Sequence, residues 1–146
     1  MEAKQVWRYK CEHCGKTGYS KGHMRKHERR CTMNPDRTCG VCIELLKQDQ
    51  PDLATLSRLL PDKDAYLTVH PADKYGCVES VEEHSEILNA VLPAIMAAAG
   101  GCPNCTAAVF RQAGIHLPSV TDFKWKEELQ RIWAPINQEG NCDGWY

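Results

Sequence analysis

The sequence contains no hydrophobic run long enough to cross a membrane. Its most apolar stretch, Ile87 to Ala99, is shorter than the roughly 20 residues of a transmembrane helix, and Asn89 and Pro93 interrupt it. The first ten residues are polar and charged, without the apolar centre of an export signal. We therefore expect a cytoplasmic protein that has no membrane partner.

The sequence also lacks the biased composition of disordered or repetitive chains. Of its 146 residues, 42% are hydrophobic and 25% are charged, which is typical of a globular protein. The net charge of -1 hides an uneven distribution. Residues 1–30 carry 9 Lys and Arg against 3 Asp and Glu, whereas residues 43–146 carry 8 against 15. A basic head thus precedes an acidic body.

Cysteine is the residue that stands out, with nine copies. An odd number cannot all form disulfides, and so many thiols in a cytosolic chain are typical of metal binding. Six of them form Cys-x-x-Cys pairs: Cys11/Cys14, Cys39/Cys42 and Cys102/Cys105. Two thiolates at this spacing can hold one tetrahedral ion from a short turn. Cys77 and Cys142 have no such partner and are predicted to be plain thiols.

The first pair belongs to a complete set of four zinc ligands. His27 and Cys31 are four residues apart and share one face of a predicted helix, while Cys11 and Cys14 suit a turn. His23, one helical turn earlier, is an alternative to Cys31. So short a segment buries little apolar surface, so we expect the metal to supply most of its folding energy.

The order Cys-x2-Cys-x12-His-x3-Cys over residues 9–31 resembles a C2H2 zinc finger whose last His is replaced by Cys. Tyr9 and Met24 stand where that family has an aromatic residue and Leu. The second family aromatic falls on Gly18, with Tyr19 one residue later. The resemblance implies a ββα-like fold for a first domain of residues 1–34.

The same resemblance implies a contact with nucleic acid. The helix positions that face DNA in the family correspond to Ser20, His23 and Lys26. Four further basic residues are available for phosphates: Lys21, Arg25, Arg29 and Arg30. One finger reads only about three base pairs. A solvated basic helix, on a finger that serves as a fold element or a protein contact, is therefore the alternative.

The remaining two Cys-x-x-Cys pairs predict a second zinc site. Cys39/Cys42 and Cys102/Cys105 each precede an apolar helical segment, and a helix N-terminus favours thiolates electrostatically. Although 59 residues separate the pairs, a folded insertion can bring them together. A site closed by four thiolates has no open position, so it indicates architecture rather than catalysis.

Two enzyme hypotheses compete for these cysteines. Cys39-Gly-Val-Cys42 resembles the thioredoxin-type redox motif, but residues 33–38 before it are a polar turn and not a buried strand. His84-Ser-Glu86 followed by Cys102/Cys105 is similar to the zinc deaminase signature, in which a Glu moves protons. Here Gly101 replaces the signature's Pro. We therefore rank both enzymes below a non-catalytic role.

The rest of the chain predicts helices, from apolar residues at helical spacing and from capping signals. They are expected between Pro51 and Pro61, Ser80 and Gly100, Pro103 and Gly114, and Thr121 and Pro135. Ser80 and Glu83 form a capping box, Pro93 should kink or divide its helix, and Pro135 should bend or stop the last one. Residues 65–69 have the composition of a short strand.

We therefore expect a mostly α fold: a finger (1–34), a helical body stapled by the four-cysteine zinc site (35–136) and a flexible tail (137–146). The body resembles small uncharacterised zinc-binding proteins of bacteriophages, which implies a bacterial host cytoplasm. The first functional hypothesis is a non-catalytic, nucleic-acid-associated regulator. The second is an effector or inhibitor whose acidic body binds a host or defence protein. A zinc-dependent deaminase is the third.

Overall fold

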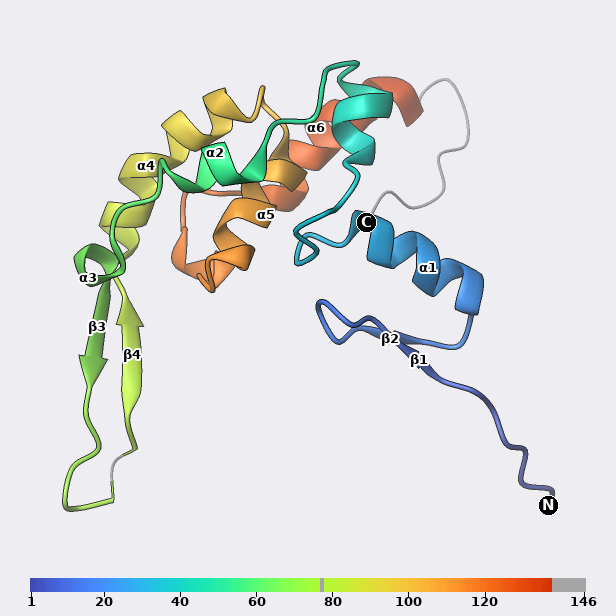
Figure 1. Ribbon diagram of the computed structural model, residues 1–146, viewed down its shortest axis with the longest axis horizontal. Coiled ribbons are helices and arrows are strands. Elements are labelled where there is room, and N and C mark those ends of the chain that lie inside the picture. Colours follow the sequence, from blue (N-terminus) through green and yellow to red (C-terminus); the bar gives the residue numbers. More distant parts are fainter. Residues whose placement is uncertain (77, 138–146) are drawn as a thin grey trace.

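The computed structural model describes residues 1–76 and 78–137, and it begins with a ββα finger. Strand β1 (Tyr9–Lys10) pairs antiparallel with β2 (Thr17–Gly18), and helix α1 (Lys21–Arg30) follows (Figure 1). Gly15 supplies the positive φ, 76°, that the turn between the strands requires. Ser20 caps α1, because its hydroxyl accepts a hydrogen bond from the backbone N–H of His23.

The finger has a very small hydrophobic core. Cys11, Met24 and Cys31 are buried, and Tyr9 packs against them. Tyr19 remains 70% exposed, so the second aromatic residue of the family pattern is outside this core. With so few apolar contacts, the finger depends on the bonds that its Cys and His side chains can make to a metal.

A helical body follows the finger, and α5 (Pro103–Gln112) lies at its centre. Every residue of α5 from Cys105 to Phe110 is buried. The surrounding elements are the π-helix η1 (Val41–Leu45), α2 (Leu53–Ser57), α3 (Lys63–Tyr66), α4 (Ser85–Ala98), the 3-10 helix η2 (Leu117–Ser119) and α6 (Trp125–Asn137). Helices α2, α4 and α6 pack against α5, so its apolar sequence is explained by contacts on all sides.

A second hairpin corrects the prediction that Ser80 and Glu83 cap a helix. Residues Leu67–His70 form β3 and residues Ser80–Glu83 form β4, with Val69 opposite Val81. The Glu83 carboxylate accepts hydrogen bonds from the backbone N–H of His116 and the hydroxyl of Ser119. These distant donors replace the local capping contact, and α4 begins only at Ser85.

The prediction of a mostly α fold is therefore only partly confirmed. Helices hold 47% of the described residues, and two small antiparallel hairpins accompany them. The strand predicted around residues 65–69 exists, one or two residues later than expected, because β4 supplies the partner that its hydrogen-bonding groups need.

Two prolines predicted to kink or divide, and to bend or stop, their helices do not interrupt them. Helix α4 continues through Pro93 and α6 through Pro135. In α4, Leu92 and Ile95 are buried in the core on either side of the proline, and this packing outweighs the lost backbone hydrogen bond. Thr121 does not cap α6; its hydroxyl accepts a hydrogen bond from the Asn89 amide instead.

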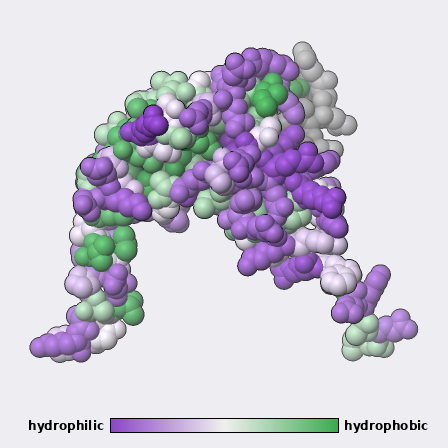
Figure 2. All heavy atoms as spheres, viewed as in Figure 1, coloured by the Kyte–Doolittle hydropathy of each residue, from purple (hydrophilic) through white to green (hydrophobic). Residues whose placement is uncertain are grey.

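The finger and the β3–β4 hairpin project from opposite ends of the helical body, which gives the molecule the outline of an arch (Figure 1). Hydrophilic side chains cover most of the finger in Figure 2. No helix in the described part of the chain is long and apolar enough to span a membrane. Cys77 and residues 138–146, which include Cys142 and nearly all of the predicted tail, lie outside the described residues.

Two glycines in the body provide a matched test of its packing. Gly100 and Gly114 both have a positive φ, 64° and 80°. A Cβ at Gly100 would lie 2.5 to 2.9 Å from the side-chain amide of Gln48, whereas a Cβ at Gly114 would contact nothing. The amide of Gln48 donates hydrogen bonds to Ala99 and to Cys42, so it cannot move without losing them.

We expect Gly114→Ala to lower the free energy of unfolding by about 1 to 2 kcal/mol through backbone strain alone. Gly100→Ala should cost about 1 kcal/mol more, because it also displaces the Gln48 amide. Thermal or urea unfolding of the two variants measures the difference. Equal destabilisation would show that the Gln48 contacts contribute nothing.

Candidate metal centres and the adjoining basic groove

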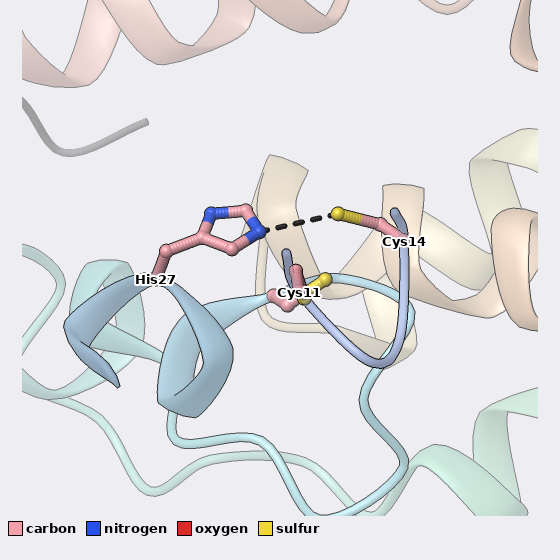
Figure 3. A group of neighbouring side chains, drawn as sticks. Cys11, Cys14 and His27 are labelled. Atoms are coloured by element: carbon pink, nitrogen blue, oxygen red, sulfur yellow. Dashed lines mark hydrogen bonds between the residues drawn. The ribbon is translucent and has the colours of Figure 1, made fainter. Parts of the chain in front are cut away.

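The first candidate metal centre joins the two halves of the finger. Cys11 and Cys14 lie on the turn after β1, where the backbone N–H of Gly15 donates to the Cys11 carbonyl. His27 lies on α1 and Cys31 directly follows it. Figure 3 shows the His27 ring directed at Cys14, with Nε2 3.2 Å from the sulfur. The helix and the turn therefore present their side chains to one point.

The chemistry and spacing of this group fit a zinc ion. One ligand atom from each of Cys11, Cys14, His27 and Cys31 lies within 4.8 Å of all the others. Ligands at about 2.0 to 2.3 Å from a tetrahedral zinc are separated from each other by distances below this limit. His23 is exposed and does not belong to the group, so Cys31 and not His23 completes it.

The environment favours ligand forms that suit a cation. Burial lowers the pKa of His27, with a further contribution from the positive charge of Lys16, so the ring stays neutral and keeps a lone pair. Burial raises the pKa of Cys31 to about 11, and the thiols of Cys14 and Cys11 oppose its ionisation further. A divalent cation at the centre would relieve this repulsion between thiolates.

The second candidate centre connects the start of the body to α5. Cys39 and Cys42 surround the beginning of η1, and Cys102 and Cys105 surround the beginning of α5. All four are fully buried, and their sulfur atoms form a second group within 4.8 Å of one another. The sulfurs of Cys39 and Cys102 are 3.5 Å apart and those of Cys42 and Cys105 are 3.6 Å apart. A disulfide bond is only about 2.05 Å long, so these cysteines are free thiols at the spacing of metal ligands.

Each sulfur of this centre is close to one N–H donor. The backbone N–H of Cys42 donates to Cys39, and that of Cys105 donates to Cys102, each at 3.5 Å. The Gln48 amide donates to Cys42 at 3.4 Å, and the guanidinium of Arg37 donates to Cys105 at 3.5 Å. Such donors stabilise thiolate ligands by spreading their negative charge.

Arg37 provides the strongest indication of thiolate charge at this centre. Its side chain is buried, with only 3% of the residue exposed, and it takes part in none of the ion pairs between described residues. A buried guanidinium that lacks a negative partner is costly. Four thiolates around a divalent cation carry a net charge of about -2, which would give Arg37 its counter-charge. The residues present therefore fit a bound zinc ion.

The four thiols influence one another's ionisation. Hydrogen bonds from Cys102, Cys105 and Cys42 hold the pKa of Cys39 below its usual value. The pKa of Cys102 is raised, because hydrogen bonds with Cys105, Cys39 and Cys42 favour its protonated form and burial adds to their effect. Four buried thiols can all lose their protons only if a bound cation supplies the positive charge that the protons carried.

This arrangement bears on the two enzyme hypotheses. The group that contains Cys102 and Cys105 is completed by Cys39 and Cys42, and His84 is not among its members. His84 instead stands just before α4, with its Nε2 atom 2.6 Å from the hydroxyl of Thr68. The four thiols of the thioredoxin-like and deaminase-like motifs thus meet at a single point, apart from His84.

Hydrogen bonds fix the finger against the body. Arg111 on α5 donates to the hydroxyl of Thr32 at 2.6 Å, and Gln112 donates to the carbonyls of Thr32 and Asn34. The Arg37 guanidinium also donates to the carbonyl of Arg30, the last residue of α1. Arg37 thus contacts the end of the finger helix and the second metal centre with the same side chain.

A groove of about 1040 Å³ lies where the finger meets the body. Six Lys and Arg residues line it, and no Asp or Glu is among the described residues of its lining. The basic residues of the lining are Lys16, Lys26, Arg29, Arg30, Arg37 and Arg111. Arg30 is paired with Glu44 at 3.3 Å, and Arg37 is buried, which leaves the other four as its principal cations.

Some of the residues predicted to contact nucleic acid line the groove, and the others do not. His23, Lys26, Arg29 and Arg30 line it. Three predicted residues are exposed outside it: Ser20, Lys21 and Arg25. Ser20 instead caps α1. One face of α1, from His23 in its first turn to Arg30 at its end, therefore lines the groove.

Several residues of these sites escaped the sequence analysis. Arg37 and Gln48 donate to sulfurs, and Lys16, Arg111 and Trp125 complete the groove. Only proximity in sequence to Cys39 and Cys42 hints at the first two. Trp125 has the helical spacing of a core residue, so the sequence favours a packing role for it. Nothing in the sequence marks Lys16 or Arg111 as groove residues, because the groove forms only when the finger and the body meet.

Metal stoichiometry tests the two centres separately. We expect the purified protein to bind two zinc ions in native mass spectrometry, Cys11→Ala to bind one, and Cys39→Ala to bind one at the other centre. His13→Ala, an exposed His of the finger outside the ligand group, should retain both. Retention of two ions by either Cys variant would contradict the ligand assignment.

Arg37→Met tests whether the guanidinium stabilises the second centre. Loss of its N–H donor and positive charge should weaken metal binding there by about 10- to 100-fold, while the first centre is unaffected. Titration with a chelator, followed by native mass spectrometry, measures this change. Arg58→Met, an exposed Arg at the end of α2, is the control and should behave like the parent protein.

No protein-family model, no curated protein and no solved structure matches this chain. The ligand spacing of the first centre remains a resemblance to C2H2 fingers, and the chain is not assigned to that family. What the protein does is accordingly inferred from the chemistry of the two centres and of the groove between them.

Proposed function

We propose that this zinc-binding protein is a non-catalytic, nucleic-acid-associated regulator. The observation that supports it is the groove between finger and body, which is lined by Lys and Arg and by no acidic residue of the described chain. Nucleic-acid backbones carry regularly spaced negative charges, and concave basic surfaces attract them strongly. Among the carboxylates of the body, that of Glu44 pairs with Arg30 at the groove, and no Asp or Glu belongs to the described residues of the lining itself.

The two metal ions have structural roles in this proposal. Each candidate centre offers four protein ligands, so a tetrahedral zinc would have no position left for water or substrate. Zinc would supply closed cross-links that hold the finger together and fasten η1 to α5. The groove lies between these two cross-links, so its walls are held by both.

The second candidate function is an effector or inhibitor that binds a host or defence protein in a bacterial cytoplasm. The β3–β4 hairpin favours it, because this hairpin projects from the body and exposes Val69 and Val81, which are 55% and 57% exposed. Apolar side chains on a projecting hairpin are typical of protein contacts.

Affinity purification from cells should recover a stoichiometric partner that the double variant Val69→Thr and Val81→Thr loses.

Salt-dependent binding tests the nucleic-acid proposal. We expect the protein to bind a fluorescent oligonucleotide at about 50 mM salt and to release it as salt rises toward about 200 mM. Replacing Lys26 and Arg29 by Ala should weaken binding at least about tenfold. It should also reduce the slope of log affinity against log salt by about 2, one for each lost phosphate contact.

The control for this experiment is the double variant Arg58→Ala and Lys63→Ala. It removes the same charge from exposed positions of the body outside the groove. Its affinity should change little, because the Debye length at these salt concentrations is only about 10 Å. No binding at low salt, or equal weakening in both double variants, would overturn the proposal.

A further inference from the structure

The position of α1 in the protein determines which form of nucleic acid it can contact. A finger that reads a duplex inserts its helix into the major groove, which is about 12 Å wide, and needs free space around that helix. Here His23 and Lys26, two of the family's three reading positions, line a groove whose other wall is the body. The body therefore lies on the side of the helix that carries these two reading residues.

The opposite wall of the groove offers a different type of contact. It contains Trp125, Asn104 and Leu129 from the body, together with Arg111. Trp125 is half-buried, and its indole N–H donates to the Asn104 side chain at 2.8 Å, which holds the ring in place. A fixed aromatic ring beside cations is the usual way in which proteins bind an unpaired base.

Cations from the finger and from the body line the same groove as this ring. Lys16, Lys26 and Arg29 are exposed on the finger side, and the half-buried Arg111 is on the body side. Arg111 uses one N–H group to bind Thr32, and a guanidinium has five such donors, so it can fasten the finger and still contact a phosphate. The groove has a volume of about 1040 Å³, and its lining also includes Cys14, His27 and Cys31 of the first candidate centre.

We infer that the groove is a binding site for single-stranded nucleic acid, with phosphates on Lys26, Arg29 and Arg111 and an unpaired base against Trp125. The inference rests on the proposed function, whose ligand it specifies. It replaces the duplex contact implied by the finger resemblance with a composite site. Both the finger and the body contribute to that site, and neither wall binds the strand alone.

The experiment compares three probes of one mixed sequence at low salt: a single-stranded DNA of about 12 nucleotides, the corresponding RNA and the DNA duplex. We expect both single strands to bind at least about tenfold more tightly than the duplex. Binding of the duplex with equal or higher affinity would overturn this inference and leave the proposed function intact. If none of the probes binds, the proposed function itself fails.

Variants of the body wall make the test specific to the groove. Trp125→Ala should weaken single-strand binding about tenfold, as expected for the loss of one stacked base, and Trp125→Phe should retain most of it. Trp7→Ala is the matched control, because Trp7 is 81% exposed and does not line the groove. If the Ala variant binds normally, or the Trp7 control weakens binding equally, the stacking contact is excluded.

A second pair of variants examines the charge on each wall. Arg111→Met should weaken binding and lower its salt dependence, whereas Arg111→Lys should restore much of both. Lys21→Ala removes a Lys of α1 that lies outside the groove, and it should have little effect compared with Lys26→Ala. Retention of two metal ions by every variant shows that the folds are intact. Equal effects of the Lys21 and Lys26 variants would place the strand outside the groove and overturn the inference.

Discussion

The fold depends on the meeting of four buried thiols from two distant parts of the chain. Cys39 and Cys42 begin the body, Cys102 and Cys105 begin its central helix, and more than sixty residues separate the partners that come within 3.5 and 3.6 Å. Closing a loop of this length costs conformational entropy, and only a strong interaction offsets it. Coordination of a zinc ion by the four thiolates would be strong enough.

Arg37 connects this centre to everything that precedes it. Its guanidinium donates to Cys105 and to the carbonyl of Arg30, so one side chain contacts the second candidate centre and also holds the end of the finger helix. Arg111 reinforces the same junction from α5 through Thr32. The basic groove is a consequence of this docking, because its two walls belong to elements anchored by different centres.

The metal ligands were predictable from sequence, while the hairpin was not. Ligand type and spacing are local properties, and the eight predicted Cys and His side chains gather as two groups of four. Ser80 and Glu83 also have a local pattern, that of a capping box, yet they lie in a strand. Glu83 finds its donors at His116 and Ser119, more than thirty residues away. The composition of residues 65–69 predicts the strand β3, but local propensity could not foresee that this strand pairs with residues Ser80–Glu83.

The sequence by itself determined which residues can hold metal, where most helices lie and that the head of the chain is basic. These features follow from spacing, periodicity and charge, which need no knowledge of distant contacts. Tertiary structure alone decided that α1 lies against the body, that Arg37 donates to a sulfur of the second candidate centre, and that Arg111 and Trp125 line one groove with Lys26 and Arg29. The physical reason is that a groove is a relation between surfaces, and only the docking of the finger on α5 brings these surfaces together.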